Sequence, residues 1–129
     1  IIKSTTYAVN TKENAMTIKR IDPEDRWSEA VIHNDTIYYT AVPENLSGDI
    51  IEQTADTLAA IDVLLQRVGS DKTQILDVTI FLADKADFEG MNKAWDAWVA
   101  KGSAPVRCTV QAQLMHPEYK VEIKIIAAM

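Results

Sequence analysis

The stretch "APVRCTVQAQL", residues 104–114, places an arginine inside a segment that alternates like a β-strand. Apolar or small residues such as Cys108 occupy its even positions, while Arg107 and Thr109 occupy odd positions beside two glutamines. A planar guanidinium can hold a carboxylate through two parallel hydrogen bonds, which fixes orientation as well as affinity. The alternative is a surface or interface ion pair, which is the commoner role of a lone arginine on a strand. The alternation predicts Cys108 to be a buried, inert thiol rather than a nucleophile.

Glu122 is the second candidate, because it lies in "YKVEIKIIAAM", the final strand-like segment of the chain. If "MHPE" closes a hairpin between the last two strands, Gln111 faces Glu122, and Glu122 lies on the Arg107 side of the sheet. A glutamate there could orient a water molecule or relay a proton to it. It could also simply pair with a neighbouring lysine or with Arg107.

Composition and charge exclude several classes of function. The 129 residues carry a net charge of −6, which argues against a nucleic-acid partner because phosphate binding depends on clustered Lys and Arg. His33, His116 and the lone cysteine have no recognisable metal-ligand spacing, and the scattered glycines form no phosphate-binding loop. No apolar run is long enough to span a membrane. The single cysteine cannot form an internal disulfide and the chain shows no secretory signal, which together predict a cytoplasmic protein.

The periodicity predicts six strands and two helices in the order βββαβαββ. Asn34-Asp35 suits a tight hairpin turn between two apolar runs. Helical spacing covers "DIIEQTADTLAAIDVLLQRVG", with Asp49 and Glu52 as a capping box, and "DFEGMNKAWDAWVAKG", capped near Asp87. The strand at residues 75–83 should carry its aliphatic row, Leu76 included, on one side. Residues 1–15 show no periodicity and are predicted to be a non-functional extension, with one domain at residues 16–129.

These elements indicate an α+β domain with one mixed, mostly antiparallel sheet and both helices on one of its faces. Segments such as "TIYYTAV" and "KIIAAM" carry few charges on either side. One layer of helices cannot cover both faces of such a sheet. We therefore expect other copies of the chain to bury the second face.

Several segments carry a resemblance to a known family. "RWSEAV", "FEGMNKAW", "APVRCTVQAQL" and "YKVEIKIIA" resemble the RidA/YjgF family of imine and enamine deaminases, and they are especially similar to its small bacterial YoaB-like branch. The resemblance covers roughly Met16 to Met129. It implies a chorismate-mutase-like fold and a homotrimer whose sheets face inward, with ligand clefts between neighbouring subunits.

The resemblance also implies residue roles. Arg107 matches the arginine that binds a substrate carboxylate, Glu122 the residue that helps to hold the attacking water, and Thr109 the position whose main chain lines the cleft. Ser28 and Thr40 match further positions of the cleft, and Trp27 stands where the family usually has Tyr, so an aromatic wall remains without its hydroxyl. Asn92 fits the family helix and is expected to be structural.

The segment "YYTAVPEN" departs from the family pattern, because Ala41-Val42 stands where the family has Gly and Gln. This difference puts the substrate range in question. The expected activity is hydrolysis of 2-imino or enamine acids to 2-oxo acids and ammonia. This hydrolysis requires a held substrate, a placed water and a proton path, so no metal or organic cofactor is expected. The alternatives are a non-catalytic trimeric binder of small carboxylates and, with less support, a nuclease or translation-related role.

Overall fold

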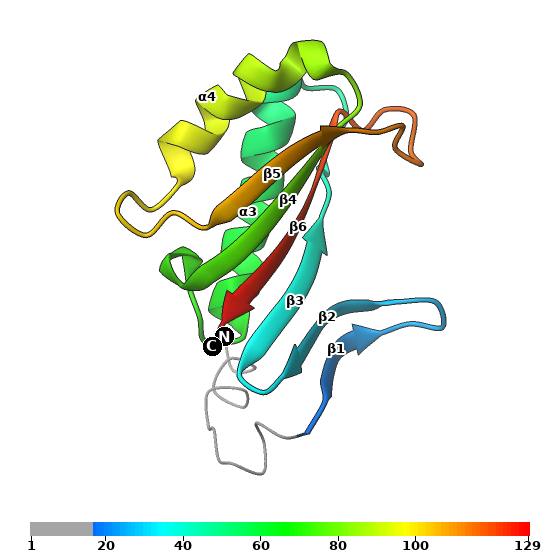
Figure 1. The fold of residues 1–129 in the computed structure, drawn as a ribbon. Helices are drawn as coiled ribbons and strands as arrows, with labels where there is room; N and C mark the ends of the chain where they lie inside the picture. Colours follow the sequence, from blue (N-terminus) through cyan, green and yellow to red (C-terminus); the bar gives the residue numbers. More distant parts are fainter. Residues whose placement is uncertain (1–16) are drawn as a thin grey trace.

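A computed structural model describes residues 17–129, so the predicted extension at residues 1–15 lies outside the described residues. The strands are β1 (Lys19–Pro23), β2 (Ser28–His33), β3 (Thr36–Ala41), β4 (Ile75–Leu82), β5 (Val106–Gln111) and β6 (Val121–Ala128). The helices are α3 (Ile50–Arg67) and α4 (Phe88–Trp98), with short 3-10 turns at Lys72–Gln74 and Lys85–Asp87. The predicted order of strands and α-helices is confirmed (Figure 1).

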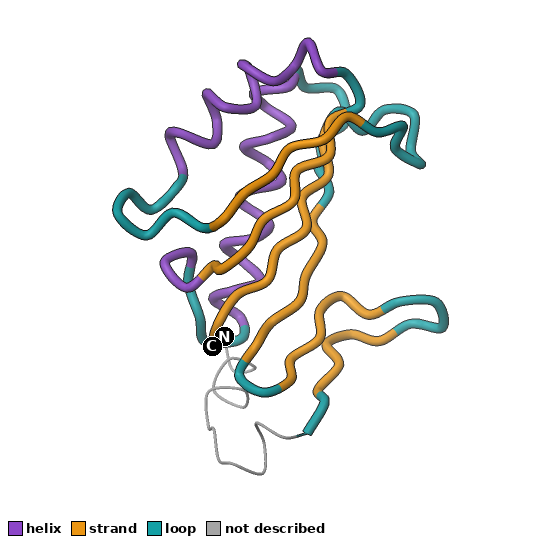
Figure 2. The backbone as a smooth tube through the Cα atoms, in the orientation of Figure 1, coloured by secondary structure: helices purple, strands orange, loops and turns teal. Residues whose placement is uncertain are grey.

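The six strands form one mixed sheet in the order β1-β2-β3-β6-β4-β5. Neighbouring strands are antiparallel except β4 and β5, which run parallel. β1 and β5 are therefore the two edge strands, and Figure 2 shows them at opposite ends of the sheet. The prediction of an α+β domain with a mixed, mostly antiparallel six-stranded sheet is confirmed.

Local sequence signals explain where the elements begin and turn. The Asp49 side chain accepts a hydrogen bond from Glu52 N, and the Glu52 side chain accepts one from Asp49 N, which completes the predicted capping box. Asn34 and Asp35 have φ angles of 52° and 58°, the left-handed values that the tight turn between β2 and β3 requires. Local sequence alone therefore sets where α3 begins and where the β2–β3 hairpin turns.

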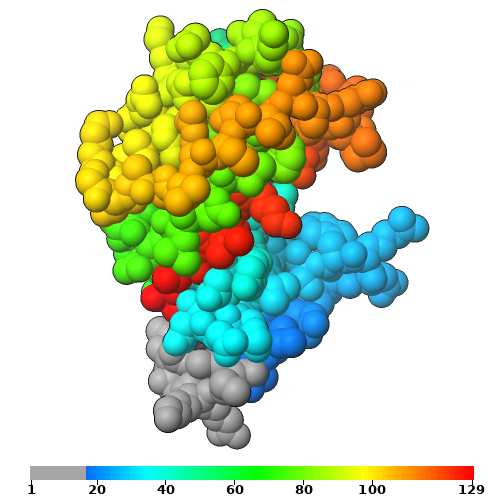
Figure 3. Space-filling view, in the orientation of Figure 1, coloured from blue at the N-terminus to red at the C-terminus, as the bar shows by residue number. Residues whose placement is uncertain are grey.

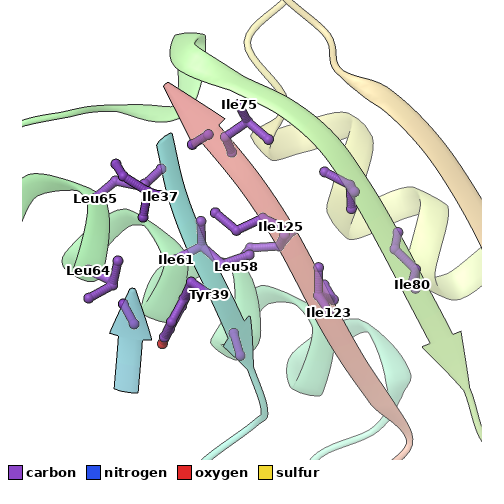
Figure 4. Packing of buried hydrophobic residues seen from close by; sticks show 14 of the residues in the cluster. Ile37, Tyr39, Leu58, Ile61, Leu64, Leu65, Ile75, Ile80, Ile123 and Ile125 are labelled. Carbon is purple, nitrogen blue, oxygen red and sulfur yellow. The ribbon is translucent and has the colours of Figure 1, made fainter. Parts of the chain in front are cut away.

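The core lies between the sheet and the two helices. Figure 4 shows Ile37 and Ile125 of the sheet packed against Leu58, Ile61 and Leu65 of α3. Each of these side chains is at most 1% exposed, and full burial of one aliphatic side chain contributes about 1.5–3 kcal/mol. This packing joins β3 and β6 to α3.

One predicted strand pairing is wrong. β5 does not form a hairpin with β6, because β4 lies between them, and β5 pairs only with β4 among the described strands. The segment β4–α4–β5 is a parallel βαβ unit, in which the helix carries the chain back across the sheet. This connection places α4 above the β5 edge of the sheet, as Figure 1 shows.

The prediction that all the aliphatic residues of one β4 row, Leu76 included, lie on the same side of the sheet is also wrong. The pairing of β4 with β6 shifts between Ile75 and Asp77, and such a bulge changes the side on which the next residue lies. Leu76 is consequently 52% exposed, while Val78 and Ile80 are buried.

Within residues 17–129 no helix covers the other face of the sheet, which is called the uncovered face, and Figure 1 views it with α3 behind the strands. It carries apolar side chains that a single chain leaves in contact with solvent. The apolar side chains on this face include Tyr38, Phe81, Val106, Val110 and Ile126. Within residues 17–129 no helix is both long and apolar enough to cross a membrane.

Candidate functional site

Arg107 lies on β5, on the side of the sheet that faces α4. It is opposite Val78, which in turn is opposite Ile125, and both of these residues are buried against the helices. The Arg107 Nη1 atom donates to Asn92 Oδ1 at 2.8 Å, and its Cζ lies 5.2 Å from the centre of the Trp95 ring. Arg107 forms no ion pair with a carboxylate of residues 17–129. A partly buried guanidinium thus keeps its full charge and several free donors.

Thr109 follows Arg107 on the same face, opposite the buried Ile80. Its Oγ1 is buried without a hydrogen-bond partner among the described residues. Ala112 N donates to Leu82 O, and alternate residues of a parallel strand direct their main-chain groups toward the same neighbour. The main-chain groups of Thr109 therefore point to the free edge of β5, where a ligand or another chain can reach them.

Glu122 does not lie on the Arg107 side of the sheet, contrary to the hairpin prediction. It is opposite Phe81, which is opposite Val110, so it belongs to the uncovered face. Its Cα is offset from that of Arg107 by two strands, roughly 10 Å, and by three residues along the strand, again roughly 10 Å. One small molecule cannot contact both side chains within a single chain.

The other predicted site residues lie away from Arg107. Trp27, 61% exposed, and Ser28 stand at the turn between β1 and β2, at the opposite end of the sheet from β5. Thr40 lies on β3 opposite Lys124, on the uncovered face with Glu122. Figure 3 shows the β1–β2 hairpin extending away from the rest of the molecule. A single chain brings Arg107 and Thr109 together, but not Trp27, Ser28, Thr40 or Glu122 with them.

Polar contacts connect the β1–β2 hairpin to the rest of the domain. The Arg67 guanidinium makes two hydrogen bonds to the Asp22 carboxylate, at 2.7 and 3.0 Å. Burial, together with the charge of Glu29 and a hydrogen bond to it, raises the pKa of Tyr39 to about 12. The Tyr39 hydroxyl therefore keeps its proton at neutral pH. These contacts join β1 to α3 and β2 to β3.

A cavity of about 750 Å³ lies where β5 ends, and the sequence interpretation missed it. Its walls include Gln111, Gln113, His116 and Tyr119, and the rings of His116 and Tyr119 stack with centres 4.7 Å apart. Nine residues separate Gln111 from Val121, which is longer than most hairpin loops. That length was the available signal that this loop forms a wall rather than a tight turn.

Comparison with known proteins identifies the fold. The family profile described as Endoribonuclease L-PSP matches residues 17–129. The chain is 70% identical over 114 residues to the RutC family protein YoaB of Escherichia coli K12, covering 88% of this chain and all of the relative. The chain belongs to the YjgF/RidA family.

Two further YjgF/RidA comparisons bear on fold and activity. A crystal structure of a YjgF family member from Neisseria meningitidis is 48% identical, covers 88% of this chain and 96% of that one, and superposes with a TM-score of 0.84. The chloroplastic protein of Arabidopsis thaliana named Reactive Intermediate Deaminase A is 29% identical over 110 residues, which are 80% of this chain and 58% of that protein.

The prediction that Cys108 is buried is wrong. Cys108 is exposed on the uncovered face, opposite Thr79, because the apolar row of β5 points away from the helices. Within residues 17–129 no group of three or more His, Cys, Asp or Glu side chains is placed to hold a metal ion. Within one chain the candidate site therefore consists of Arg107 and the main chain at Thr109.

Proposed function

We propose that this protein is a hydrolytic deaminase that converts 2-imino or enamine acids to 2-oxo acids and ammonia. The observation that supports this proposal is the Arg107 guanidinium, which is partly buried, free of any described carboxylate partner and located on a free edge strand. Such a group suits a small planar carboxylate. The name of the Arabidopsis relative, Reactive Intermediate Deaminase A, supports a deaminase.

The proposal includes a site formed between chains of a homotrimer. Trp27 lies at one end of the sheet and Arg107 at the other, while Glu122 is on the opposite face. If the uncovered faces point inward, as in a chorismate-mutase-like trimer, the hairpin and Glu122 of one chain can approach β5 of the next. The exposed apolar row of Val106, Cys108 and Val110 favours such burial.

In the proposed reaction Arg107 holds the substrate carboxylate, and the main chain at Thr109 hydrogen-bonds to the bound acid. Glu122 orients a water molecule and takes its proton as the oxygen adds to the imine carbon. Glu122 returns this proton to the nitrogen, so the carbon then bears one hydroxyl and one amino group. The hydroxyl gives its remaining proton to the amino group through Glu122 as the carbon–nitrogen bond breaks, and the products are the 2-oxo acid and ammonia. Trp27 and Ser28 of the neighbouring chain would close the cleft, with Thr40 at its border. No step requires a metal or an organic cofactor.

We expect the chain to form a trimer in solution. The exposed apolar residues of the uncovered face would otherwise remain in water. Multi-angle light scattering at micromolar concentration should give a mass three times the 14.4 kDa of one chain. A stable monomer would contradict both the trimer and the site between chains.

Turnover is tested directly with 2-iminobutanoate generated in the cuvette by an amino-acid oxidase or a threonine dehydratase. We expect the protein to accelerate the appearance of 2-oxobutanoate, and a denatured sample at the same concentration controls for spontaneous hydrolysis. Binding of 2-oxobutanoate without acceleration would instead support a non-catalytic binder of small carboxylates. The separation of Glu122 from Arg107 within one chain is the observation that favours that alternative.

The remaining alternative is a nuclease, which the family name Endoribonuclease L-PSP suggests. The net charge of −6 argues against it. A cytoplasmic location forms part of the deaminase proposal, since short-lived imines arise where amino acids are metabolised.

A further inference from the structure

Three side chains of α4 contact the guanidinium of Arg107. Asn92 Oδ1 accepts from Nη1 at 2.8 Å, Met91 Sδ lies 3.9 Å from the same nitrogen, and the Trp95 ring lies 5.2 Å from Cζ. Met91 and Trp95 are buried, at 0% and 6% exposure. The arginine is therefore bounded by side chains that packing already fixes in place.

All three contacts are electrically neutral. A partly buried arginine is usually paired with a carboxylate, which compensates its charge but also occupies its donors. An amide oxygen accepts one hydrogen bond and leaves the net charge intact, and an aromatic face adds attraction without neutralising it. This neutral environment keeps both the charge and the remaining N–H groups of Arg107 available to an incoming anion.

The Asn92 side chain has no other hydrogen-bond partner among residues 17–129. Its oxygen is therefore not needed to cap α4 or to join that helix to the sheet. If the residue were only a structural part of the helix, any side chain of similar size would serve. The hydrogen bond that the Asn92 side-chain oxygen accepts from Arg107 Nη1 is the reason for an amide at this position.

We propose that Asn92 is a positioning residue that orients the Arg107 guanidinium for a carboxylate while leaving its charge uncompensated. Met91 and Trp95 restrict the guanidinium from its other sides. This inference rests on the proposed function, because it assumes that Arg107 is the carboxylate-binding group. It assigns to α4 a part in ligand affinity although Asn92 need not touch the ligand.

The test compares Asn92→Asp with Asn92→Ala, using calorimetric binding of 2-oxobutanoate and the melting temperature of each variant. Aspartate has the shape of asparagine but pairs with Arg107 and competes with the ligand. We expect Asn92→Asp to keep or raise the melting temperature and to weaken binding by more than about tenfold. Asn92→Ala should weaken binding less, because the guanidinium loses orientation but keeps its charge.

Lys93→Ala is the matched control, since it makes the same change in net charge at the neighbouring, exposed position without contacting Arg107. Its binding should equal that of the wild type. Wild-type affinity in Asn92→Asp would overturn the inference, whether or not Asn92→Ala folds. If Arg107→Ala still abolishes binding in that case, the proposed function stands and only the role of Asn92 fails. Normal binding by Arg107→Ala would instead refute the proposed function itself.

Discussion

Replacing Arg107 with alanine should nearly abolish 2-oxobutanoate binding and imine turnover while leaving the chain folded. Truncation removes the charged partner of the ligand carboxylate in a partly dry site. The expected cost is about 2–5 kcal/mol, or roughly thirtyfold to several-thousandfold in affinity. Calorimetry for binding, the coupled imine assay for turnover and a thermal melt for stability measure the three effects separately.

Arg107→Lys makes this prediction more specific. Lysine restores the charge but not the planar, two-pronged donor geometry, nor the stacking on Trp95. Only part of the lost affinity should return. A purely structural arginine predicts another pattern, in which both variants lose stability or assembly and the remaining folded protein binds normally. Normal binding by a well-folded Arg107→Ala protein would refute the assignment.

Mixing two inactive variants should restore activity. If each site combines Arg107 of one chain with Glu122 of its neighbour, Arg107→Ala and Glu122→Gln chains complement each other when they assemble together. Each mixed trimer then has one intact site, so random assembly of equal amounts should give about a quarter of wild-type turnover. The measurement is the imine assay after the two proteins are denatured and refolded as one sample.

The control combines the same two variants after each has refolded separately, under conditions where subunits do not exchange. That sample should be as inactive as either parent, although all the chains are present. If co-refolded trimers also stay inactive, Arg107 and Glu122 do not form one site across a subunit boundary. An active Glu122→Gln parent would show that this glutamate does not hold the attacking water.

Elements defined by local chemistry could be predicted from the sequence. The capping box of Asp49 and Glu52 and the turn at Asn34-Asp35 depend on residues within one turn of each other. Both helices and all six strands followed from periodicity. Arg107 was singled out because a guanidinium in an otherwise alternating strand is chemically conspicuous.

Which strands are neighbours, and hence which face a residue occupies, could not be settled in the same way. Treating β5 and β6 as a hairpin placed Glu122 beside Arg107, whereas β4 in fact separates them. A strand, a helix and another strand in succession favour parallel pairing, and this signal was available at β4–α4–β5. The exposure of Cys108 has the same origin, because alternation reveals two rows without revealing which row faces the helices.

The parallel β4–α4–β5 unit has a consequence for how the family can diversify. Arg107 and the α4 residues that contact it belong to one continuous stretch of chain, whereas Trp27 and Ala41-Val42 lie outside it, on the hairpin and at the end of β3. Under the proposed function, mutations in the second group could alter which acids are accepted without disturbing the arginine. Affinity for the acid group and selectivity for the rest of the molecule would then be encoded in separate segments, and each could evolve at its own rate.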